Sequence, residues 1–144
     1  MLEYIQKSTK EDLQKTCKAK IDENGDIFEM YITFYDKIIN IIKNNKNCRF
    51  YKMLLANLRA NDGMIFVQDN SKSELFNYIL KHTDTSKFKN KDDLATVINM
   101  LNAITRWSII QTVLLNSNST DLREDFIKQI NYLKNGILRK EKQC

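Results

Sequence analysis

Residues 94–120 read LATVINMLNAITRWSIIQTVLLNSNST, and this stretch decides the fold. It contains a single charged residue, Arg106, although 28% of the chain is charged. A transmembrane helix needs about 20 predominantly apolar residues, and the interspersed asparagines, Arg106 and Gln111 are too polar for that environment. We therefore predict a central hydrophobic helix wrapped by other helices. The periodicity does not decide whether residues 94–116 form one helix or two.

Proline is absent from the 144 residues, and glycine occurs three times, at positions 25, 63 and 136. Helices can therefore run long, and turns that connect strands are scarce. The chain length suits one domain with a sizeable core. We predict an all-α fold in a single domain, with residues 1–25 as an N-terminal extension or extra helix and residues 139–144 as a basic tail.

Outward from the central stretch, apolar residues recur at steps of three and four. Capping-box patterns begin at Ser8 and Ser71, and Asn44 to Asn47 form a turn. The resulting prediction is helices over residues 9–22, 27–43, 48–60, 75–80 and 121–138. The polar run from His82 to Lys91 is predicted to be a mobile loop.

The 27–43 segment has an unusually wide apolar arc, with polar positions confined to a narrow stripe. The arc is wider than packing on a single neighbour requires. We expect this helix to be covered on two sides, by its own core and by a partner. A second subunit is one way to supply that cover.

Charge and cysteine use narrow the function classes further. The net charge is +5, but the 23 basic residues are scattered among acidic ones, which is more typical of a solvated surface than of a nucleic-acid site. Cys17, Cys48 and Cys144 are far apart and odd in number, so we expect reduced thiols. Neither a secretory signal nor a membrane anchor is expected.

The sequence offers no catalytic constellation. His82 is the only histidine, and the adjacent pairs Asp92-Asp93 and Glu124-Asp125 point in different directions on a helix. Phosphate-binding glycine loops, nucleophile elbows and metal-ligand spacings are missing. We therefore predict a non-enzymatic protein without a cofactor or metal, which acts through a recognition surface.

Arg106 is the residue of interest for such a surface, because a buried unpaired charge costs about 3–5 kcal/mol. It can pair with an internal acid, reach water along its aliphatic stem, or anchor a guest helix in an apolar groove.

Three segments carry a family resemblance: YITFY at 31–35, CRFYKMLL at 48–55 and ITRW at 104–107. In order and spacing they resemble the poxvirus Bcl-2-like proteins, above all the vaccinia-type intracellular immunomodulators. The resemblance implies a Bcl-2-like helical bundle around a central hydrophobic helix, located in the host cell cytoplasm. It implies a virulence factor that binds host proteins and inhibits innate signalling through NF-kappa-B or interferon-regulatory factors.

The resemblance also implies a homodimer through two helices, with a candidate face of Tyr31, Tyr35, Phe126 and Ile130. One departure from the family is that Ser108 follows Trp107, where the cellular Bcl-2 signature has glycine. This departure and the expected lack of an anchor favour signalling inhibition.

Two alternatives remain open. The first is an anti-apoptotic mimic that sequesters pro-apoptotic helices. Its candidate groove comprises Met53, Leu54, Leu58, Phe76, Leu80, Ile104 and Arg106. The second and more distant alternative is a basic helical nucleic-acid binder, although our expectation for partners is host proteins and no nucleic acid.

Overall fold

The structure is a computed structural model that describes residues 2–44, 74–90, 93–115 and 119–138. These residues form α-helices, and no β-strand occurs among them apart from a single antiparallel bridge between Phe88 and Leu138. The all-α prediction is therefore confirmed for the described parts of the chain. The helices are α1 (Leu2–Asn24), α2 (Ile27–Asn44), α4 (Glu74–His82), α5 (Leu94–Leu115) and α6 (Ser119–Ile137).

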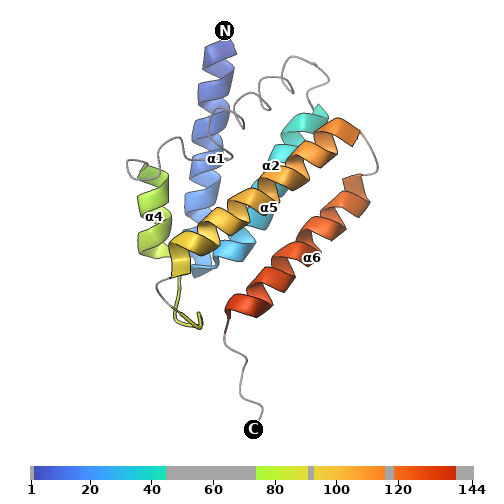
Figure 1. The fold of residues 1–144 in the computed structure, drawn as a ribbon. Coiled ribbons are helices and arrows are strands. Elements are labelled where there is room, and N and C mark those ends of the chain that lie inside the picture. Colours follow the sequence, from blue (N-terminus) through green and yellow to red (C-terminus); the bar gives the residue numbers. More distant parts are fainter. Residues whose placement is uncertain (1, 45–73, 91–92, 116–118, 139–144) are drawn as a thin grey trace.

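Helix α2 lies at the centre of the packing. It contacts α1 on one side and α5 on another, and it also touches α6. Helix α5 packs along α6, while α4 packs against α1 (Figure 1). The largest fully buried side chains come from several of these helices and include Tyr31, Phe34, Tyr35, Leu101 and Phe126.

The wide apolar arc of α2 is thus covered within one chain. Its buried side chains include Phe28, Met30, Ile38 and Ile39, and its neighbours α1, α5 and α6 supply the contacts. Much of the described part of this arc is therefore covered without a partner, because sequence periodicity gives the width of an apolar face but not the number of intrachain neighbours.

The α1–α2 corner has a clear local cause. Gly25 adopts φ of 70°, a left-handed conformation that ends α1 and that L-residues with a Cβ rarely adopt. The Asp26 carboxylate then caps α2, since its Oδ1 accepts hydrogen bonds from the backbone N–H groups of Phe28 at 3.0 Å and Glu29 at 3.2 Å. Glycine and aspartate in succession therefore turn the chain sharply between two helices.

The predicted helices agree with the described structure except at the start of α1. Helix α1 begins at Leu2 rather than near Thr9, because the residues before the predicted cap include no helix breaker. Residues 94–115 form one helix, which settles the question that the periodicity left open. Residues 48–60 and the cap residue Ser71 lie outside the described residues.

The segment after α4 differs most from its prediction. Phe88 is buried, and two backbone bonds fasten its neighbours: Asp84 N–H donates to Gly25 O at 2.9 Å, and Lys89 N–H donates to Ile137 O at 2.9 Å. A segment that was predicted to be a mobile loop is therefore packed between the α1–α2 corner and the end of α6. The polar composition of this segment predicted a solvated loop, although it contains one large apolar residue, Phe88, that is buried.

Candidate ligand-binding site

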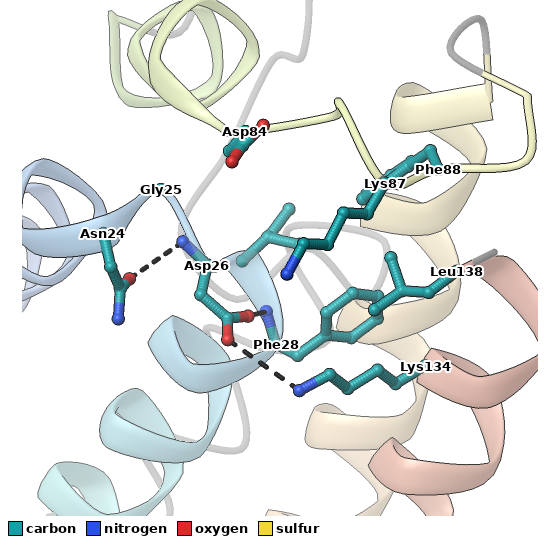
Figure 2. A pocket seen from close by; sticks show the side chains of 10 residues that line it. Asn24, Gly25, Asp26, Phe28, Asp84, Lys87, Phe88, Lys134 and Leu138 are labelled. Atoms are coloured by element: carbon teal, nitrogen blue, oxygen red, sulfur yellow. Dashed lines mark hydrogen bonds and ion pairs between the residues drawn. The ribbon is translucent and has the colours of Figure 1, made fainter. Parts of the chain in front are cut away.

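A cavity of about 210 Å³ lies at one end of the helices, where the α1–α2 corner, the segment after α4 and the end of α6 meet. Figure 2 shows the lining side chains converging on this space from those three parts of the chain. The lining residues are Asn24, Gly25, Asp26, Ile27, Phe28, Asp84, Lys87, Phe88, Lys134 and Leu138.

The cavity walls are held together by close backbone contacts. A Cβ atom built on Gly25 would lie 2.9 Å from both the Cβ and the backbone N of Asp84, so only glycine permits this approach. On the opposite side, the antiparallel bridge between Phe88 and Leu138 joins the loop to the end of α6. Backbone contacts therefore hold the segment after α4 against both the α1–α2 corner and the end of α6.

Two phenylalanines belong to one wall of the cavity. The ring centroids of Phe28 and Phe88 are 6.2 Å apart at an interplanar angle of 41°, within the range of favourable ring pairs. The ammonium of Lys134 lies 6.0 Å from the centroid of the Phe28 ring, at the outer limit of a cation–π contact. Both rings are nearly fully buried, Phe28 at 3% and Phe88 at 2% exposure, so they support the cavity and present little surface to it.

The charged lining consists of two aspartates and two lysines, but these are engaged differently. Asp26 Oδ1 caps α2, and Asp84 Oδ1 accepts a hydrogen bond from Ser86 N–H at 2.9 Å. Hydrogen bonds from Ser86 also lower the pKa of Asp84. Lys134 reaches Asp26 Oδ2 at only 3.9 Å, and Lys87 forms no ion pair within the part of the chain that the structure describes. The carboxylates are thus committed to local structure, whereas the ammonium groups keep unused donors.

The predicted groove residues do not form this cavity. Phe76 and Leu80 lie on α4, which packs on α1, whereas Ile104 and Arg106 lie on α5, which packs on α2 and α6. The other three predicted residues, Met53, Leu54 and Leu58, lie outside the described residues. The described groove residues therefore lie on separate helices, and the groove itself stays a prediction.

Arg106 is half-buried, and its Nε is buried without a hydrogen-bond partner among the described residues. No ion pair of Arg106 with a carboxylate occurs there either.

The predicted dimer face lies inside the chain. Tyr31, Tyr35, Phe126 and Ile130 are all at most 1% exposed. Tyr35 stacks on Phe126 with ring centroids 4.3 Å apart, and the Tyr31 hydroxyl donates to Asn102 Oδ1 at 2.7 Å. These side chains hold α2, α5 and α6 together, so none is available on the surface of the single chain.

Sequence reasoning missed the cavity because its residues are scattered among apparent loops. The available signals were Phe88, the only large apolar residue in the run from His82 to Lys91, and the Gly25-Asp26 pair. Neither signal shows that the end of α6 returns to the same place. That proximity is a result of tertiary packing.

Other kinds of site have no support in the described residues. Cys17 is buried, and burial raises the pKa of its thiol to about 12, which makes it a poor nucleophile. No group of histidine, cysteine and acidic side chains suited to a metal ion occurs in these parts of the chain. None of the described helices has the length and apolar character needed to cross a membrane.

The described helices thus form a helical domain with a small cavity of mixed apolar and charged lining. Comparison with protein families places it more narrowly. The family model described as "Tetracyclin repressor-like, C-terminal domain" matches residues 26–137, and the chain belongs to this family. Comparisons with curated proteins and with solved structures gave no match.

This membership corrects the resemblance to the poxvirus Bcl-2-like proteins, which was wrong. The short segments behind it are degenerate patterns of aromatic and aliphatic residues that recur in unrelated helical proteins. The predictions of a viral inhibitor of host signalling, of host-protein partners and of a host-cell location were wrong for the same reason. The exclusion of nucleic acid as a partner is also overturned, because repressors of this kind act on DNA.

Proposed function

We propose that this chain is the ligand-binding and dimerisation domain of a transcriptional regulator of the tetracyclin repressor-like class. The observation that carries the proposal is the family match, which covers residues 26–137. The all-helical fold and the cavity at the α1–α2 corner support it. In this role the domain binds a small molecule and pairs with a second copy, and it is not an enzyme.

In this proposal the described helices do not supply the DNA-binding surface of the regulator. Several of their basic side chains are paired with acidic residues of the same chain: Lys37 lies 2.8 Å from Asp12, Lys20 lies 3.1 Å from Glu29, and Arg123 lies 2.7 Å from Asp36. These cations are engaged by carboxylates of the same chain and are therefore less available to phosphates.

The outer side of α5 is the best-supported surface for a second copy. Met100 is 44% exposed and Trp107 is 56% exposed, and Ala103 lies exposed between them. Their spacing of three and four residues places all three on one stripe of the helix. A stripe with an exposed tryptophan and no charged residue is typical of the central part of a protein interface.

Light scattering tests the dimer. We expect a mass twice that of the 17.0 kDa chain, and a shift toward monomer when Met100→Gln and Trp107→Gln are combined. Leu80→Gln, an exposed apolar position on α4, is the matched control and should leave the dimer intact. A wild-type chain that remains monomeric at high concentration would overturn the dimerisation role.

Deletion of the gene in its own cell tests the regulatory role. Loss of a ligand-responsive regulator should change the transcripts of a small set of genes, and restoring the gene should reverse that change. RNA sequencing that shows no reproducible difference would contradict the proposal, whatever the oligomeric state.

A further inference from the structure

We draw no further inference here: the strongest candidate, the cavity between the α1–α2 corner, the segment after α4 and the end of α6, belongs to the site already described, and its two aspartates balance its two lysines, so that its lining selects no ligand class.

Discussion

The two sides of α5 differ in the residues that they present. The inner side buries apolar residues such as Leu101 and Ile109 together with four polar ones, Asn102, Thr105, Ser108 and Thr112. The outer side leaves Met100 and Trp107 exposed. Polar groups are therefore part of the packed side of the helix, while two large apolar groups lie outside it.

The inner side tolerates polar groups because partners satisfy most of them. Tyr31 donates to Asn102, and the hydroxyls of Tyr35 and Thr112 lie 3.3 Å apart. Thr112 also donates to the backbone oxygen of Ser108 at 2.9 Å. Buried polar groups that are hydrogen-bonded in this way contribute to a specific packing arrangement. The outer side has no such partner within the described parts of the chain, and its apolar surface is the one that the proposed dimer would use.

The largest effect is expected at the inner aromatic stack. Phe126→Ala removes a fully buried ring that stacks on Tyr35, and it should lower the free energy of unfolding by about 3–5 kcal/mol. Denaturant unfolding monitored by circular dichroism measures this loss. Tyr132→Ala on the same helix is the control, because that side chain is 68% exposed and should cost about 0.5 kcal/mol or less.

A smaller effect is expected from one inner hydroxyl. Tyr31→Phe removes the 2.7 Å hydrogen bond to Asn102 in a fully buried setting, and it should cost about 1–2 kcal/mol. Tyr78→Phe is the matched control, since the Tyr78 hydroxyl bonds to Asp22 at an exposed position. Equal losses in the two variants would show that the buried polar contacts of α5 have no special weight.

The inner side also contains an unsatisfied group, which gives a prediction of opposite sign. Thr105 Oγ1 is buried without a hydrogen-bond partner among the described residues. Thr105→Val keeps the shape and removes the hydroxyl, so stability should stay the same or rise by up to about 1 kcal/mol. Thr112→Val, which removes a bonded hydroxyl, should instead lower stability by about 1 kcal/mol.

The smallest effect on folding is expected on the outer side. Trp107→Gln should change the concentration-independent part of the unfolding free energy by about 0.5 kcal/mol or less, because the side chain is largely exposed in the single chain. Unfolding at several protein concentrations separates this part from dimerisation. A loss above 1 kcal/mol at every concentration would mean that the outer side belongs to the core.

Much of the secondary structure could be predicted from local patterns. The lack of proline, the recurrence of apolar residues and the capping-box patterns were sufficient to predict helices at residues 27–43, 75–80 and 121–138. The uncharged stretch from Leu94 was correctly predicted as helical. It was also predicted to be wrapped by other helices, whereas Met100 and Trp107 are exposed. Absence of charge shows only that a segment avoids strong hydration and does not show which side faces the core.

The candidate site could not be predicted in the same way. Phe88 and Lys87 read as parts of a solvated loop, and Lys134 reads as an exposed position on a terminal helix. Their use in one cavity depends on a backbone bridge between Phe88 and Leu138, two positions distant in sequence. The resemblance to the poxvirus Bcl-2-like proteins was wrong for a related reason, because short aromatic patterns reflect helix packing and do not identify function.

The sequence by itself determined that this protein is helical and where most of its helices run, because helix formation depends on neighbours three and four positions apart. Tertiary packing was needed to show that α5 buries four polar residues among its apolar ones and that the α1–α2 corner, Phe88 and the end of α6 meet around a small cavity. Both features depend on contacts between segments that are distant in the sequence. The energy of each contact depends on both residues that form it, and a local sequence pattern contains only one of them.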